Sequence, residues 1–118
     1  MSTTLKFEDT YKDFTIIAMW YTELGGHWCG YFGKNGFIID PETITLHGGC
    51  DVFNKNPNFN KKFLMYGFDC VHNNDSNIGP NGEFGVSLSY DTKSMEWTKE
   101  KVMDHLRQVI DEIVPIKM

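Results

Sequence analysis

The end of the sequence carries the pattern that most restricts the fold. Apolar residues recur there at the spacing of one helix face: Val102, Leu106, Val109, Ile110 and Ile113. Thr98 is a suitable N-cap, Glu100 lies in the first turn where the helix dipole favours an acid, and Pro115 ends the segment. The sequence therefore predicts one amphipathic helix, whose apolar face needs a partner surface.

The segments before this helix have the composition of β-strands. Residues 14–22 are almost continuously apolar and rich in β-branched and aromatic types, which favours a strand covered on both faces. A Gly25-Gly26 turn follows, and residues 27–32 resume the strand pattern, so a hairpin is expected, with Gly30 marking a bulge or a close backbone approach. Residues 62–70 are apolar on both faces, which predicts a central strand.

Five further segments give weaker signals. Residues 42–47 alternate, with Ile44 and Leu46 directed inward, as in a half-buried strand. Residues 84–90 suggest a short edge strand or an extended connection. The stretches 54–60 and 73–82 are dense in Asn, Asp, Gly, Ser and Pro and predict loops. Residues 1–13 fit a short helix, a strand or a frayed arm.

This order of elements predicts an α+β fold with a single domain over residues 1–118. We expect an antiparallel sheet of about four to five strands with the C-terminal amphipathic helix packed on one face.

Composition excludes several classes of function. The net charge is −5 and basic residues are scattered, which argues against binding nucleic acid. No apolar run approaches the roughly 20 residues of a membrane span, and no signal peptide is recognisable. Three cysteines without a C-x-x-C spacing indicate a reduced, cytoplasmic protein without a zinc motif. Aromatic residues make up 14% of the chain, which suits a core and also a ligand pocket.

Candidate site residues gather in two short stretches. His47, Gly48 and Gly49 form a polar glycine turn, and Asp69, Cys70, His72 and Asp75 follow the central strand. Paired glycines allow a close backbone approach, although no phosphate-loop motif is present. We interpret these seven residues as two walls of one binding site, or of a hydrogen-bonded junction.

The chemistry of these residues leaves alternatives open. Cys70 and His72 share a strand face and suggest a thiolate–imidazole pair, but their spacing aims them poorly for proton transfer, and a buried thiol beside a histidine is the simpler interpretation. Asp69 would either accept backbone N–H groups or orient a histidine or ligand. His47 and His72 with Asp69 or Asp75 would suit zinc or iron, but the spacing matches no metal motif, so neither metal nor cofactor is predicted.

Three motifs together resemble a family of small, functionally uncharacterised proteins encoded by bacteriophages and prophages. They are Cys29-Gly30-Tyr31, His47-Gly48-Gly49, and Gly67-Phe68-Asp69-Cys70 followed by His72 and Asp75. Members of that family often carry Gly-His-Pro where this chain has residues 33–36, and Leu-Thr where it has Cys50-Asp51. The resemblance implies a viral origin and an accessory or counter-defence role in the host cell.

The favoured functional interpretation is binding. The protein would sequester a small polar or nucleotide-like ligand, or block a host protein. One alternative is a small hydrolase that uses Cys70 with His72 or His47, or a metal held by histidine and aspartate. The other is a structural or assembly role.

Overall fold

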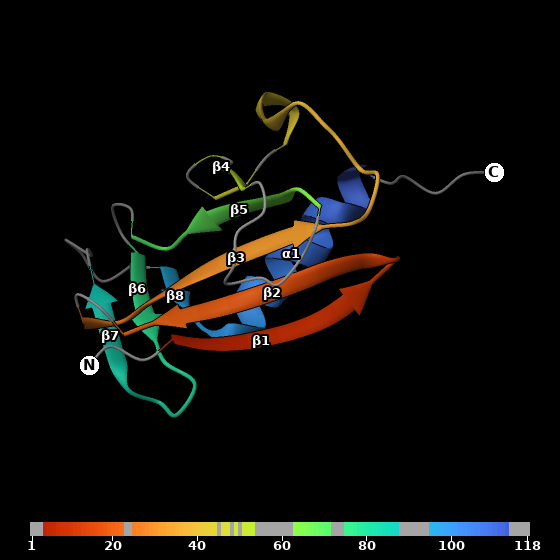
Figure 1. Cartoon of the computed structure of the whole chain (residues 1–118). Helices are drawn as coiled ribbons and strands as arrows, with labels where there is room; N and C mark the ends of the chain where they lie inside the picture. The colour runs from red at the N-terminus through yellow and green to blue at the C-terminus, as the bar shows by residue number, and fades with distance from the viewer. Residues whose placement is uncertain are drawn as a thin grey trace.

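The computed structural model describes residues 4–22, 25–44, 46–47, 49, 51–53, 63–71, 75–87 and 95–113. These residues form two β-sheets and one helix, an α+β arrangement (Figure 1). The larger sheet is antiparallel and has the order β1-β2-β3-β5-β4. The smaller sheet has the order β7-β6-β8, with β6 antiparallel to β7 and parallel to β8.

The bounds of the elements follow the chain. The larger sheet comprises β1 (Thr4–Tyr11), β2 (Phe14–Tyr21), β3 (His27–Gly33), β4 (Asp51–Phe53) and β5 (Met65–Asp69). The smaller sheet comprises β6 (Asp75–Ile78), β7 (Phe84–Ser87) and β8 (Met95–Trp97). A short 3-10 turn, η2, spans Pro41–Thr43, and the helix α1 spans Lys99–Ile113. No helix in these described ranges is long and apolar enough to cross a membrane.

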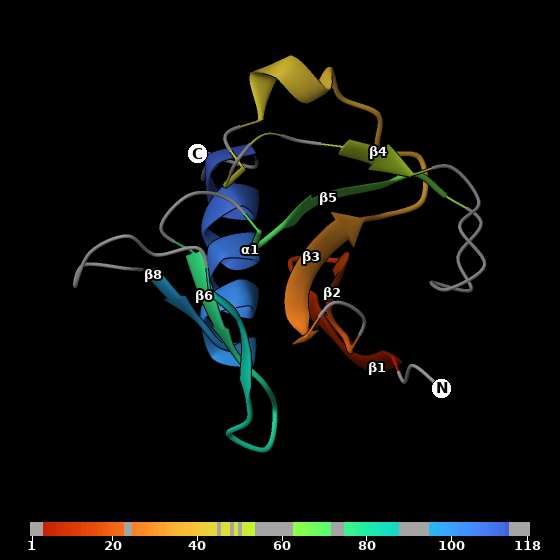
Figure 2. The ribbon, with the colours of Figure 1, turned by 90° about the vertical axis from the view of Figure 1, so that its left-hand side faces the viewer.

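The helix covers one face of the larger sheet (Figure 2). Its buried side chains are Val102, Met103, Leu106, Val109 and Ile110. They share a core with alternate residues of β2, among them Phe14, Ile16 and Trp20. Thr98 caps the helix as expected, since its Oγ1 accepts the Lys101 N–H at 3.3 Å. The predicted amphipathic helix packed on one face of an antiparallel sheet is therefore confirmed.

The opposite face of the larger sheet is also apolar and buried. Ile17, Met19, Cys29, Tyr31 and Met65 form a second cluster there, each at most 6% exposed. The prediction that β2 and β5 are apolar on both faces is confirmed, and β5 lies inside the sheet between β3 and β4.

Glycines and aromatic rings interlock where β3 pairs with β5. Gly30 lies opposite Phe68, and Tyr31 lies opposite Gly67. A Cβ at Gly30 would approach the Phe68 ring to 2.5 Å, and a Cβ at Gly67 would clash with the Tyr31 ring. Each glycine therefore makes room for the aromatic ring on the neighbouring strand, on opposite faces of the sheet. The expected close approach at Gly30 is confirmed.

The weaker segments differ from the expectations in part. Residues 42–47 are not a strand where they are described: they begin within η2, although Ile44 and Leu46 are buried as predicted. The expected loop 73–82 contains β6, because two of its polar side chains are satisfied by tertiary hydrogen bonds. Residues 4–11 form a strand, and Phe84–Ser87 is an edge strand of the smaller sheet.

Candidate functional site

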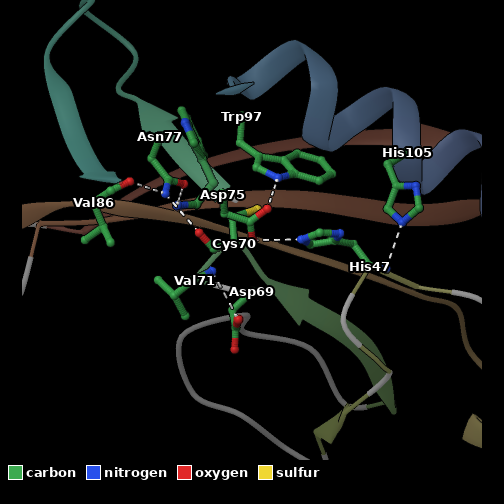
Figure 3. Close-up of polar contacts among 10 residues, drawn as sticks. His47, Asp69, Cys70, Val71, Asp75, Asn77, Val86, Trp97 and His105 are labelled. Carbon is green, nitrogen blue, oxygen red and sulfur yellow. Dashed lines mark hydrogen bonds and ion pairs between the residues drawn. The ribbon is translucent and has the colours of Figure 1, made fainter. Parts of the chain in front are cut away.

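A buried carboxylate lies at the centre of the candidate site. Asp75, on β6, is 1% exposed, and its two oxygens have different partners (Figure 3). Oδ2 lies 2.8 Å from Nε2 of His47, and Oδ1 accepts the indole N–H of Trp97 at 3.0 Å. A buried carboxylate needs such partners, because an unsatisfied charge in the interior is strongly unfavourable. The contact with a carboxylate, which only accepts, places a proton on Nε2 of His47.

A second histidine lies next to the first. His105, on α1, accepts the backbone N–H of His47 at its Nε2, at 3.1 Å. An accepting Nε2 has no proton, so the neutral His105 ring carries its proton on Nδ1. Burial lowers the pKa of His105, with a smaller contribution from the neighbouring His47 and an opposing one from Glu112. The loop that carries His47 is thereby attached to the helix.

Four rings form one continuous cluster around these hydrogen bonds. The His47 and Trp97 centroids are 4.9 Å apart, those of Phe68 and His105 are 5.0 Å apart, and those of Phe68 and Trp97 are 5.6 Å apart. The rings come from the 44–47 segment, β5, β8 and α1. Tilted and edge-on contacts at these separations are favourable for aromatic groups. The cluster holds His47 by its ring as well as by its nitrogen.

Asn77 joins the two sheets beside this cluster. It is 2% exposed, and its Oδ1 accepts the Trp28 N–H at 3.0 Å. Its Nδ2 donates to the carbonyl oxygens of Cys70 and Val86, both at 2.9 Å. The Trp28 indole N–H donates to the carbonyl oxygen of Ile78 at 2.7 Å. Asn77 therefore stabilises the end of β5, where the site predicted from the sequence begins (Figure 3).

The surroundings of two predicted site residues indicate structural roles. Cys70 is fully buried in the core beneath the helix, and burial raises the pKa of its thiol far above the usual range, with further contributions from Cys29, Asp75 and Asp69. The thiol is therefore protonated and inaccessible, unlike a catalytic nucleophile. The Asp69 carboxylate accepts the N–H of Val71 at 3.4 Å and lies away from the ring cluster (Figure 3). That contact matches the loop-capping alternative.

The remaining predicted residues are placed unevenly. Gly49 has a φ of 108°, which favours glycine, and a Cβ there would meet open space. Gly48 and His72 lie outside the described residues. Within the described ranges, no three His, Cys, Asp or Glu side chains converge in a way that would hold a metal ion.

An open pocket of about 310 Å³ adjoins the ring cluster on the helix side. Two residues of the cluster, Trp97 and His105, contribute to its wall, and the rest of the lining is Lys101, Asp104 and Gln108. Aromatic, cationic, acidic and amide groups therefore face the same space. The volume falls at the lower end of the range of about 300–1,000 Å³ that is typical of small-molecule sites.

The sequence indicated part of this site. His47 and Asp75, 28 positions apart, were both expected in it, and they are in hydrogen-bond contact. Asn77, Trp97 and His105 were not expected. A polar residue in an Asn-rich stretch, a tryptophan before a helix cap and a lone helix histidine give no local signal of a shared site.

Comparison of the chain with protein-family models, with curated proteins and with solved structures finds no match.

Proposed function

We propose that this protein acts by binding a small, polar, partly planar ligand of the nucleotide type in the pocket beside Trp97 and His105. The observation that carries the proposal is the set of contacts made by the buried Asp75 carboxylate. A fully buried carboxylate fixes the orientation of His47, whose side chain remains 27% exposed, and of Trp97, which lines the pocket. Preorganised rings beside a mainly apolar pocket with a few polar groups are the usual arrangement for ligand binding.

The lining suggests the ligand class. His105 offers a ring surface to a planar base beside the largely buried Trp97, and Lys101 offers one cation to a phosphate. Asp104 and Gln108 supply an acceptor and an amide for the polar edge of a base. A pocket with one cationic side chain, in a chain of net charge −5, suits a small phosphorylated molecule better than a nucleic acid.

Covalent catalysis at Cys70 has less support. The thiol is buried and its pKa is raised, so the thiolate needed for attack is not formed. The metal alternative depended partly on His72, which lies outside the described residues, so it stays an untested alternative.

The biological setting follows from the resemblance to phage and prophage proteins. In that setting the protein would act in the host cytoplasm as an accessory, counter-defence factor that sequesters a nucleotide-like molecule. Blocking a host protein is the alternative binding role, and it makes no use of the pocket.

Thermal-shift and calorimetric titration with nucleoside monophosphates, dinucleotides and cyclic dinucleotides tests the proposal. A ligand that binds only the folded state raises the unfolding temperature in a concentration-dependent manner. Lys101→Ala should weaken the binding of phosphorylated ligands about tenfold, because one charge-assisted hydrogen bond is worth about 1.5 kcal/mol. Lys34→Ala, in the turn after β3, is the matched control and should leave affinity unchanged.

Asp75→Asn adds a test that separates positioning from folding. The amide introduced at position 75 can accept from Trp97 and donate to Nε2 of His47, which moves the His47 proton to Nδ1. We expect a folded protein whose His47 tautomer, read by ¹⁵N NMR, is reversed and whose ligand affinity is reduced. No titratable binding by any ligand of the panel, with wild-type protein folded, would overturn the pocket proposal.

A further inference from the structure

The outer edge of β1 is a long strand edge at the boundary of the larger sheet. β1 has eight residues and is first in the strand order, so in the described part of the chain it pairs only with β2 (Figure 1). Exposed edges of this length tend to pair with another strand unless something opposes it. The side chains of β1 determine which strand can pair with this edge.

The hairpin fixes which backbone groups of β1 face outward. β1 and β2 are joined by two residues, Lys12 and Asp13, with φ of 49° and 69°, the conformation of a type I′ turn. In such a hairpin the flanking residues Tyr11 and Phe14 form a hydrogen-bonded pair, and the pattern then alternates along the strand. The outward-facing groups are therefore those of Thr4, Lys6, Glu8 and Thr10.

One contact supports this assignment independently. The N–H of Thr10 donates to Oδ1 of Asp9 at 2.8 Å, so it points away from β2. The side chains of Lys6 and Glu8 lie on the same face of the strand, 3.7 Å apart at Nζ and Oε1. Opposite charges thus alternate along the outer edge.

We propose that β1 pairs with β1 of a second copy of this chain, antiparallel and across a two-fold axis at Phe7. In this register Lys6 lies opposite the partner's Glu8, and Glu8 lies opposite the partner's Lys6. Thr4 lies opposite the partner's Thr10 in the same way. Lys6 and Glu8 then use both outward backbone groups, whereas Thr10 uses only its carbonyl oxygen, which accepts the N–H of the opposed Thr4, because the Thr10 N–H is held by Asp9. This gives about six hydrogen bonds, and the opposed side chains are complementary.

Neighbouring registers are opposed by charge. The outward groups restrict the register to shifts of two residues. A shift in one direction places Lys6 against the partner's Lys6, and a shift in the other places Glu8 against the partner's Glu8. Each shift also loses a pair of hydrogen-bonding residues. The centred register is the one that combines full pairing with opposite charges.

A groove on the helix side of this edge fits the same partner. It measures about 500 Å³ and lies between β1 and the start of α1, with Phe7 and Met103 as its apolar lining. The axis brings the partner's Phe7 next to Phe7, as a close cross-strand aromatic pair, beside this groove. The second copy would join the two larger sheets into one continuous sheet.

Charge exchange at the edge tests the proposal. Sedimentation of the wild-type chain over a range of concentrations should show a monomer–dimer equilibrium. Lys6→Glu and Glu8→Lys should each weaken the dimer about tenfold or more, because each creates two like-charge contacts per dimer. The double variant Lys6→Glu/Glu8→Lys restores complementarity and should dimerise like the wild type. Circular dichroism verifies that each variant is folded.

Mixing gives the sharpest outcome. An equimolar mixture of the Lys6→Glu and Glu8→Lys variants pairs glutamates with lysines at all four positions, so it should form a heterodimer while each variant alone is monomeric. In the wild-type dimer the amides of Lys6 and Glu8 should gain protection from hydrogen exchange with concentration, whereas that of Phe7 is protected throughout. A wild-type chain that is monomeric at every concentration, or a dimer insensitive to these exchanges, would overturn the proposal.

Discussion

At the scale of single residues, two buried polar side chains on β6 organise the region. Asp75 directs its oxygens to side chains, His47 and Trp97, whereas Asn77 directs its amide to backbone groups of other segments. The first arrangement orients rings beside a pocket, and the second connects strands. Two residues apart on one strand, they share a face, so site and junction are built from the same short element.

Asn77→Ala should be strongly destabilising. The substitution leaves the Trp28 N–H and two carbonyl oxygens without their partner in a buried place, and each such group costs about 1–3 kcal/mol. We expect the free energy of unfolding, measured with urea, to fall by about 3–5 kcal/mol. Asn81→Ala, in the exposed turn between β6 and β7, is the control and should change it by less than about 0.5 kcal/mol. An equal, small effect at both positions would show that the Asn77 hydrogen bonds contribute little.

At the scale of elements, α1 is attached to the His47 segment by a histidine that must remain neutral. Burial lowers the pKa of His105 below its ordinary value of 6.5. Between the two values the unfolded chain binds more protons than the folded chain, so stability rises with pH. As pH falls below about 6.5, the protein should therefore lose stability, by at most about 1.4 kcal/mol per pH unit from this group.

His105→Gln isolates that contribution. Glutamine retains an acceptor near the position of Nε2 for the His47 N–H but does not titrate. The free energies of unfolding of the wild type and the variant are measured by denaturant titration from pH 7.5 to pH 5. As pH falls, the wild type should lose stability relative to the variant. A difference independent of pH would contradict the assignment of this acid sensitivity to His105.

The elements also show which features the sequence could reveal. Strands 14–21, 27–33 and 65–69 and the helix are recognisable because apolar periodicity is local, and Gly30 marks a close approach before any partner is known. β6 is hidden, because Asp75 and Asn77 are typical loop residues until tertiary contacts satisfy them. Strand pairing places Trp97 next to His47, and helix packing places His105 there. Residue spacing in the sequence indicates neither contact. The motifs Cys29-Gly30-Tyr31 and Gly67-Phe68-Asp69 form the interlocked pair of β3 and β5, a packing feature beside the site.

At the scale of the whole molecule, buried contacts connect the two sheets in the part of the chain that the structure describes. Asn77 and Trp28 link them by hydrogen bonds, and Trp97 of β8 packs on Phe68 of β5 at 5.6 Å. All three tryptophans are buried, at most 4% exposed. Trp20 and Trp28 lie on the larger sheet and Trp97 on the smaller one, and Trp28 and Trp97 each contact the other sheet, so their fluorescence is sensitive to separation of the two sheets.

We expect the two sheets to unfold in one cooperative transition. The hydrogen bonds of Asn77 mean that separating the sheets exposes unsatisfied groups in both, so a state with one sheet folded is disfavoured. In Trp97→Phe the remaining tryptophans lie on strands of the larger sheet, and in Trp20→Phe/Trp28→Phe the remaining one lies on β8 of the smaller sheet. Each variant loses stability, but within each the urea midpoint by fluorescence should equal that by far-ultraviolet circular dichroism. A smaller-sheet fluorescence midpoint clearly below the dichroism midpoint would show that β6–β8 separate first, and the candidate site would then lie on a locally unfolding unit.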